Sequence, residues 1–192
     1  MSLSPGTYTI HDTDATLVLT NWTGSLRIGI YRPFGGSNQK WYVKRYPEGF
    51  LYAIQNVATN KYVPDNMDGS DMPGVDEIHA AILSLEHQFQ DFYLIKLSGT
   101  KVHLEHPNTE PTPNDENYAP VSLVNKDTPK GCFWRFERIS DDAGGDLKPR
   151  TNNSIPALSP PQSNNILSQG SGSQYTDDAV LQARFSCVVR VY

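Results

Sequence analysis

The chain has 192 residues, a formal net charge of −5 and 38% hydrophobic residues, which suits one domain with a buried core. Charged residues make up only 19% of the sequence and form no dense basic stripe, so we expect no nucleic-acid partner. No apolar run approaches the roughly 20 residues of a membrane span and no secretory signal opens the chain, so we expect a cytoplasmic protein or one released by a non-classical route.

Residues 1–139 read as short β-strands throughout, because runs rich in Val, Ile, Thr, Tyr and Leu alternate with Gly, Pro, Asn and Asp. The best helix candidate is 76–89, where Ile78, Ile82 and Leu85 are spaced like one helix face. We favour a strand there for consistency with its neighbours. The expected strands, in chain order, are 6–10, 16–20, 26–31, 40–46, 50–57, 80–85, 91–97, 101–106, 120–124 and 132–139.

The composition changes after these strands. The acidic segment 139–146 marks the expected boundary, and 19 of the 27 residues in 149–175 are Ser, Asn, Pro, Gln or Gly. Such a segment buries too little apolar area to offset its ordering entropy, so we predict disorder there. Residues 179–192 become apolar again and read as a strand-like segment, whose docking the sequence leaves open. The expected organisation is a domain of residues 1–139 followed by a tail of residues 140–192.

A tripeptide pattern divides the expected domain into three repeats. Gln-Lys-Trp at 39–41 has weaker copies in Gln-Asp-Phe at 90–92 and Cys-Phe-Trp at 132–134, with spacings of 51 (92 − 41) and 42 (134 − 92). One four-stranded unit cannot bury its apolar face, whereas three units around an axis can close a barrel without sheet edges. The glutamine amide can tie down backbone groups of the adjoining loop. We predict that the three aromatic residues plug a common core: Trp41, Phe92 and Trp134.

Three stretches of the sequence resemble fungal β-trefoil proteins of the ricin B-type lectin family, which carry a Gln-x-Trp (QxW) repeat. They are PGTYTI near the N-terminus, FGGSNQKW with GFLYAIQNVATNKYV, and CFWRFERI. The resemblance covers residues 1–139 and is strongest over 34–63. It implies an all-β fold, a β-trefoil of three four-stranded repeats in which three hairpins cap a six-stranded barrel. It also implies carbohydrate binding in shallow pockets, up to one per repeat, with glycans or glycoproteins as partners and no catalysis.

The first repeat keeps most of the residues that this resemblance implies for a sugar site. Tyr31 stands where the family places its stacking aromatic, and Asn38 directly precedes Gln39. The expected acid is missing, but Asn21 can replace it through its amide, and Trp22 offers a second aromatic platform. The alternative is structural: the two asparagines cap turns while the tyrosine packs on the barrel wall.

The other repeats are poorer candidates for a sugar site. The second has an acid, Asp65 or Asp68, but its third strand offers His87 instead of an aromatic residue. The third has Glu105 as a possible acid, but Cys132 replaces the glutamine.

The sequence is also compatible with functions other than sugar binding. Similar fungal trefoils inhibit proteases through exposed loops, for which 31–38 and 107–118 are the candidates here. A scaffold with decayed sites is a third possibility, and a homodimer would supply the avidity that a weak site needs.

The sequence offers little support for other chemistry. His103, Glu105 and His106 do not converge on a strand, and the acidic loop 65–77 lacks EF-hand spacing, so we expect no metal and no cofactor. Nucleophile and phosphate-binding motifs are also missing, so we expect no enzyme. The two cysteines are too few for a disulfide scaffold and are expected to be free thiols, although pairing stays open.

Overall fold

The computed structural model describes most of the expected domain. Its described residues are 2–13, 16–68, 73–106, 119–125 and 131–149. The predictions of disorder at 149–175 and of a strand-like segment at 179–192 therefore fall almost wholly outside the described residues. The same holds for the inhibitor-loop candidate 107–118.

The described residues are all-β, as predicted, apart from two 3-10 turns. A strand is confirmed in the region of 80–85, although it runs over Leu83–Phe89, while the helix-like pattern in the same region yields only the turn η2. Neither turn has the length or apolar character to cross a membrane. The elements are β1 (Gly6–His11), β2 (Val18–Asn21), β3 (Ile28–Tyr31), η1 (Ser37–Gln39), β4 (Trp41–Arg45), β5 (Tyr52–Asn56), η2 (Glu77–His79), β6 (Leu83–Phe89), β7 (Phe92–Leu97), β8 (Val102–Glu105), β9 (Ala119–Pro120), β10 (Ser122–Asn125) and β11 (Phe133–Ser140).

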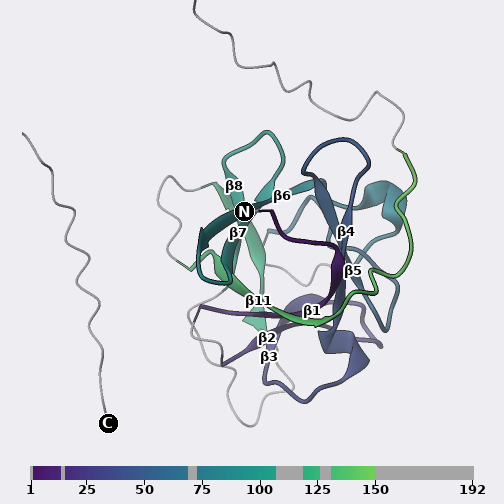
Figure 1. The fold of residues 1–192 in the computed structure, drawn as a ribbon. Coiled ribbons are helices and arrows are strands. Elements are labelled where there is room, and N and C mark those ends of the chain that lie inside the picture. Colours follow the sequence, from purple (N-terminus) through teal and green to yellow (C-terminus); the bar gives the residue numbers. More distant parts are fainter. Residues whose placement is uncertain (1, 14–15, 69–72, 107–118, 126–130, 150–192) are drawn as a thin grey trace, which may run out of the picture. The chain divides into compact units, whose positions relative to one another are not determined.

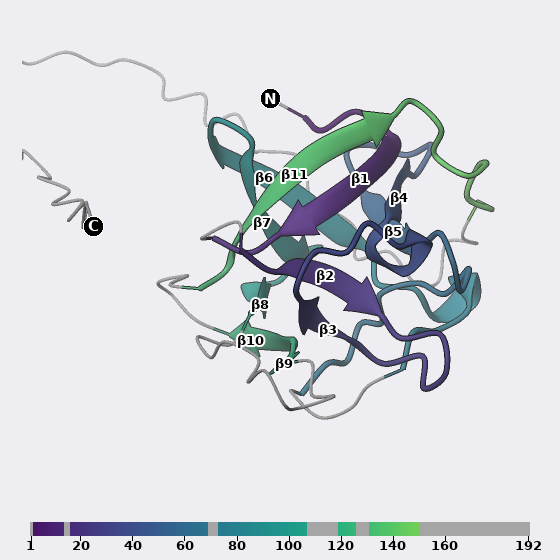
Figure 2. The same ribbon diagram turned by 90° about the horizontal axis from the view of Figure 1, so that it is seen from below.

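Six of these strands form a closed ring (Figure 1). β1 pairs with β4, β4 with β5, β5 with β6, β6 with β7, β7 with β11, and β11 returns to β1, every pair antiparallel. The hairpins β2/β3 and β8/β10 lie to one side of the ring (Figure 2), and an isolated bridge joins Tyr62 to Val75 at the corresponding place in the second repeat. This arrangement is the predicted β-trefoil, and its closure leaves the ring without an unpaired edge.

Two of the three predicted core plugs are confirmed. Trp41 and Trp134 are both fully buried. The indole Nε1 of Trp41 donates to the carbonyl oxygen of Leu19 at 2.8 Å, and that of Trp134 donates to Leu104 at 2.9 Å. Each tryptophan therefore fills the core and also ties its barrel strand to the first strand of its own hairpin.

The prediction for Phe92 is wrong. This residue begins β7 and is only partly buried, because the neighbouring Tyr93 takes the inward direction and side chains alternate along a strand. The third plug is Leu83, which is fully buried in the same cluster as the tryptophans. The spacings between plugs are thus 42 (83 − 41) and 51 (134 − 83) residues.

Strand register supports this assignment. Trp41 lies opposite Tyr8, and Trp134 lies opposite Tyr93. In the second repeat the residue opposite Tyr52 is Leu83. The three tyrosines are all buried in the core, so each plug faces an equivalent partner.

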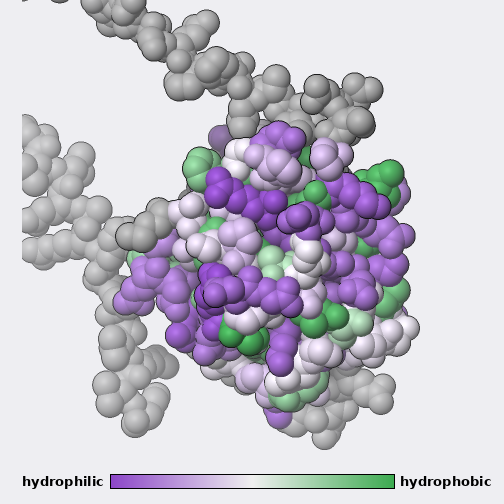
Figure 3. Space-filling model, turned by 45° about the vertical axis from the view of Figure 1, so that its right-hand side comes forward, coloured by the Kyte–Doolittle hydropathy of each residue, from purple (hydrophilic) through white to green (hydrophobic). Residues whose placement is uncertain are grey.

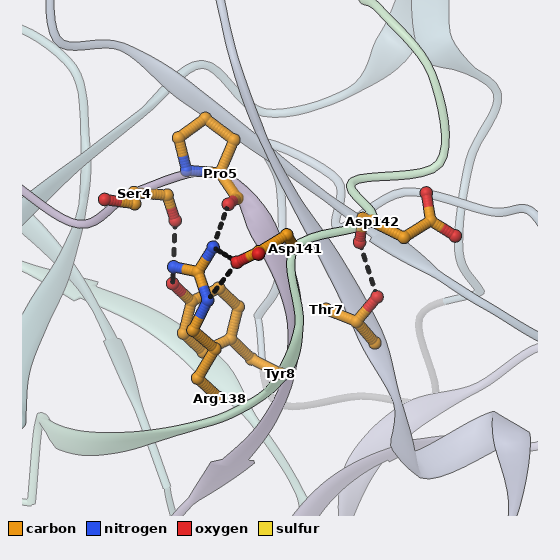
Figure 4. A network of polar contacts seen from close by, with 7 residues as sticks. All are labelled: Ser4, Pro5, Thr7, Tyr8, Arg138, Asp141 and Asp142. Atoms are coloured by element: carbon orange, nitrogen blue, oxygen red, sulfur yellow. Dashed lines mark hydrogen bonds and ion pairs between the residues drawn. The ribbon is translucent and has the colours of Figure 1, made fainter.

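The first and last strands are joined by a polar cluster around Arg138 (Figure 4). Its guanidinium donates to the Tyr8 hydroxyl at 2.8 Å and to the Pro5 carbonyl at 2.9 Å, and it pairs with Asp141 at 2.6 Å. Beside it, the Thr7 hydroxyl donates to the carbonyl oxygen of Asp142. These contacts lock the two ends of the described chain together.

The chain stays packed after the expected boundary at residue 139, which falls inside β11. Lys44 Nζ donates to the carbonyl oxygen of Gly144 at 2.7 Å. Leu147 is buried in a second small apolar cluster with Tyr46 and Tyr62. Residues 140–149 therefore belong with the packed domain, and the division between domain and tail stays a prediction for residue 150 onward.

Few large apolar side chains are exposed among the described residues. On the face shown in Figure 3, hydrophobic residues occur in separate small groups among hydrophilic ones. The exposed large hydrophobic residues in the described part of the chain are Phe34, Phe50, Ile78, Phe89 and Ile139.

Candidate functional site

Gln39 organises the loop that follows β3. Its side chain is 1% exposed. The amide oxygen accepts from the backbone N–H groups of Phe34 at 2.8 Å and Gly35 at 3.2 Å. The amide nitrogen donates to the Arg32 carbonyl at 2.8 Å and the Thr20 hydroxyl at 3.2 Å. The predicted tie to the adjoining loop is confirmed, and the position of Gln39 is beneath the surface that the loop presents.

Asn21 has a similar role on the other side of the same surface. It is fully buried at the end of β2. Its amide nitrogen donates to the carbonyl oxygens of Leu26 at 2.5 Å and Arg27 at 3.0 Å, while its oxygen accepts from the Thr59 hydroxyl at 2.5 Å. These contacts match the structural alternative, in which Asn21 holds a turn instead of facing a ligand.

Three aromatic side chains meet above these buried amides. Tyr31, at the end of β3, makes edge-to-face contacts with Trp22 at 5.5 Å and 84° and with Phe34 at 6.3 Å and 75°, measured between ring centroids and planes. Such contacts are favourable for aromatic pairs and fix the orientation of the rings. Tyr31 is half-buried, whereas Phe34 is 58% exposed. We call Trp22, Tyr31 and Phe34 the aromatic surface.

A glycine brings a polar group next to this surface. A Cβ atom on Gly36 would lie 2.4 Å from Phe34 Cε2 and 2.6 Å from Asn38 Oδ1. A side chain at this position would therefore displace the Phe34 ring or the Asn38 amide from its present place. Asn38 itself is half-buried, and its backbone carbonyl accepts from the Asn56 side chain at 2.9 Å.

The structure thus brings the sequence-predicted residues together in two layers. Trp22, Tyr31 and Asn38 lie toward the surface, while Asn21 and Gln39 lie beneath it as supports. Sequence reasoning missed Phe34, although its place in a Gly-rich loop that follows a proline was a signal for an exposed aromatic.

The arrangement suits recognition better than chemistry. Aromatic rings can cover the C–H face of a ligand, and an amide beside them can donate to and accept from hydroxyl groups. Among the described residues there is no group of three or more His, Cys, Asp and Glu that could hold a metal ion. His106 instead lies with Nε2 2.9 Å from the Thr13 hydroxyl and packs edge-on against Trp134.

The matching positions in the other repeats lack the buried glutamine. Ala81 stands two residues before the plug Leu83, and Cys132 stands two residues before Trp134; both are buried. Neither side chain offers an amide that could hold a loop, so the described part of the chain builds this layered arrangement once.

Solved structures similar to the chain include β-trefoil lectins of fungi. The Rhizoctonia solani agglutinin is 27% identical, with a TM-score of 0.60, over 72% of this chain and 99% of its own. The Macrolepiota procera ricin B-like lectin, solved in complex with lactose, is 17% identical, with a TM-score of 0.58, over 72% of this chain and 99% of its own. The Polyporus squamosus lectin, bound to a human-type influenza-binding epitope, is 18% identical, with a TM-score of 0.52, over 72% of this chain and 50% of its own.

No protein-family model matches the sequence. The likenesses therefore support the β-trefoil fold, and membership of the Gln-x-Trp family stays a prediction.

Proposed function

We propose that the protein is a non-catalytic, lectin-like carbohydrate-binding protein whose binding surface lies in the first repeat. The observation that carries the proposal is the aromatic surface of Trp22, Tyr31 and Phe34 beside Asn38, held by the buried Gln39. The similarity to fungal lectins, one of them in complex with lactose, supports the same class of ligand.

Binding would use the two sides of a pyranose ring differently. The aromatic side chains cover its apolar C–H face, and the Asn38 amide exchanges hydrogen bonds with a neighbouring hydroxyl. Because Gln39 already fixes the loop, little conformational entropy is lost on binding.

The missing carboxylate limits the affinity. Asn21, the expected substitute for the acid, carries no charge and so cannot supply a charge-assisted hydrogen bond. Its amide is also buried and holds the 22–27 turn, so it does not reach the surface. We expect a dissociation constant of about 1 µM to 1 mM for a single site of this kind. Useful avidity would need more than one contact or a homodimer.

The test is a glycan array probed with the full chain, followed by titration of the strongest hit against variants. Tyr31→Ala should weaken binding roughly tenfold, because an aromatic contact of this kind contributes up to about 1.4 kcal/mol. The control is Phe50→Ala, which removes an exposed aromatic side chain from the β4–β5 turn and should leave binding unchanged.

Three outcomes would count against the proposal. They are silence across the array, equal loss in the control, and unchanged binding by Tyr31→Ala. Titration against papain-like and trypsin-like proteases then tests the inhibitor alternative, which shares the loop 31–38.

A further inference from the structure

The turn between β6 and β7 carries a second group of aromatic side chains. Phe89 is 50% exposed and stacks on Phe92, with ring centroids 4.9 Å apart and planes at 26°. It also lies 5.9 Å from the ring of Phe133 on the neighbouring strand β11. We call these three residues the turn patch. They occupy the outer side of the barrel wall, because the adjoining Tyr93 and Trp134 face the core.

An ion pair borders the turn patch. Arg135 Nε donates to Asp91 Oδ2 at 2.7 Å, and the side chains remain 39% and 42% exposed, respectively. This contact engages one carboxylate oxygen and one guanidinium nitrogen. A partly exposed carboxylate and guanidinium side by side can accept from and donate to two adjacent hydroxyl groups.

The turn itself is held in place. Gln90 adopts a positive φ of 47°, and its carbonyl oxygen lies 2.8 Å from His87 Nε2. The carbonyl oxygen of Asp91 accepts from the backbone N–H of Phe136 at 3.1 Å. The aromatic ring and the ion pair therefore keep a fixed relation to each other, which lowers the entropic cost of binding.

The other described barrel turn provides a contrast. In the β4–β5 turn, the exposed Phe50 has the Arg45 guanidinium 4.4 Å from its ring centroid, so a cation covers one face of that ring. Phe89 instead stacks on the ring of Phe92. The charged groups near it, Asp91 and Arg135, form an ion pair with each other.

We propose that the turn patch is a second carbohydrate-contact surface, where Phe89 covers the apolar face of a pyranose and the Asp91–Arg135 pair binds its hydroxyl groups. The proposal rests on the carbohydrate-binding function proposed above. It places an acid beside an aromatic ring, which the first repeat lacks. A chain with both surfaces would meet a branched or multivalent glycan at two points, and avidity would then follow without a second subunit.

The test is a ¹H–¹⁵N NMR titration of the full chain with lactose, methyl α-mannopyranoside and N-acetylglucosamine at millimolar concentrations. At least one sugar should shift the amide signals of residues 88–92 and of Arg135. Phe89→Ala should weaken that response roughly tenfold. Asp91→Asn should weaken it with the ring intact, and Phe50→Ala is the matched control that should not.

The two surfaces report separately in this experiment. Shifts at 31–38 without shifts at 88–92 overturn the turn patch and leave the proposed function standing. Shifts at 88–92 alone support the turn patch and count against the first repeat. Silence at both positions overturns both proposals. Shifts at 88–92 that depend on protein concentration without sugar indicate self-association and overturn the turn patch as a sugar site.

Discussion

The first and second repeats solve the same packing problem with different residues. At the plug and two positions before it, the first repeat has Trp41 and Gln39, and the second has Leu83 and Ala81, all four of them buried. The barrel accepts either pair, because Trp41 and Leu83 each fill the core with apolar volume. Only the first pair also makes side-chain hydrogen bonds beyond the barrel: the Trp41 indole donates to the Leu19 carbonyl, and the Gln39 amide binds the loop.

The hairpin of the first repeat is also more regular than the corresponding region of the second. β2 and β3 pair over four residues each in the first repeat. In the described part of the second repeat, the corresponding region holds isolated bridges, such as Tyr62 with Val75 and Pro64 with Ala80. The comparison indicates that the fold needs only the bulk of the plug, while an ordered surface loop needs the polar groups attached to it.

Truncating the plugs should produce the largest effect. Trp41→Ala should lower the free energy of unfolding by about 4 kcal/mol and Leu83→Ala by about 3 kcal/mol, since both empty a packed core. Phe92→Ala, the residue first expected in this role, should cost only about 1 kcal/mol because its ring is partly exposed. Urea denaturation of the three variants measures the loss in the free energy of unfolding. A larger loss for Phe92→Ala than for Leu83→Ala would contradict the assignment.

Gln39→Ala gives the first repeat the residue of the second at this position. We expect a loss of about 2 to 3 kcal/mol, because the partners in the loop lose their hydrogen bonds, and a loss of sugar binding at 31–38. Gln55→Ala is the control, since its amide makes one exposed bond to the Asn60 carbonyl and should cost at most about 0.5 kcal/mol. Thermal unfolding measures the stability of both variants, and titration with the strongest glycan-array hit measures their sugar binding. Equal losses in the two variants would contradict the role of Gln39 in holding the loop.

Trp41→Phe isolates the indole donor from the bulk of the ring. The buried carbonyl oxygen of Leu19 loses its partner, so the free energy of unfolding should fall by about 1 to 2 kcal/mol. Trp134→Phe should behave alike, because its donor reaches Leu104 in the same way. Urea denaturation with unchanged midpoints would show that the tie between barrel and hairpin adds nothing.

The smallest effect concerns an exposed ion pair in the second repeat. The hydrogen bond and charge of Lys61 hold the pKa of Asp76 below its usual value. A lowered folded-state pKa contributes stability that is present above the unfolded value of about 3.9 and is lost as the pH falls through the folded value. Lys61→Met should return the pKa of Asp76 toward that usual value, measured by NMR titration of the carboxyl group. The pKa of Asp91, lowered by Arg135, should stay unchanged as the control.

Sequence alone could predict the all-β fold, the plugs Trp41 and Trp134 and the role of Gln39, because each carries a distinctive residue type. The sequence analysis misassigned the second plug because Gln90 and Phe92 match the Gln-x-aromatic pattern, whereas Ala81 and Leu83 do not. Only strand register distinguishes them. The buried tyrosines 8, 52 and 93, spaced 44 and 41 residues apart, were the overlooked periodic signal.

The candidate site was predictable in part for a related reason. An aromatic residue at a strand end is recognisable, so Tyr31 and Trp22 were found. A polar residue such as Asn21 looks the same in sequence whether it faces solvent or binds buried carbonyl groups, so its supporting role needed the three-dimensional contacts.

The pairing of β1 with β11 also bears on how the gene could be rearranged. Thr7 lies directly opposite Ser140, and antiparallel neighbours of this kind have Cα atoms only about 5 Å apart. The start of β1 and the end of β11 are therefore close enough for a peptide linker, which must also span or replace the packed residues 141–149, and new termini could open at the exposed residues 48–50. Such a circular permutant would keep every barrel strand in register and leave the first-repeat loop untouched.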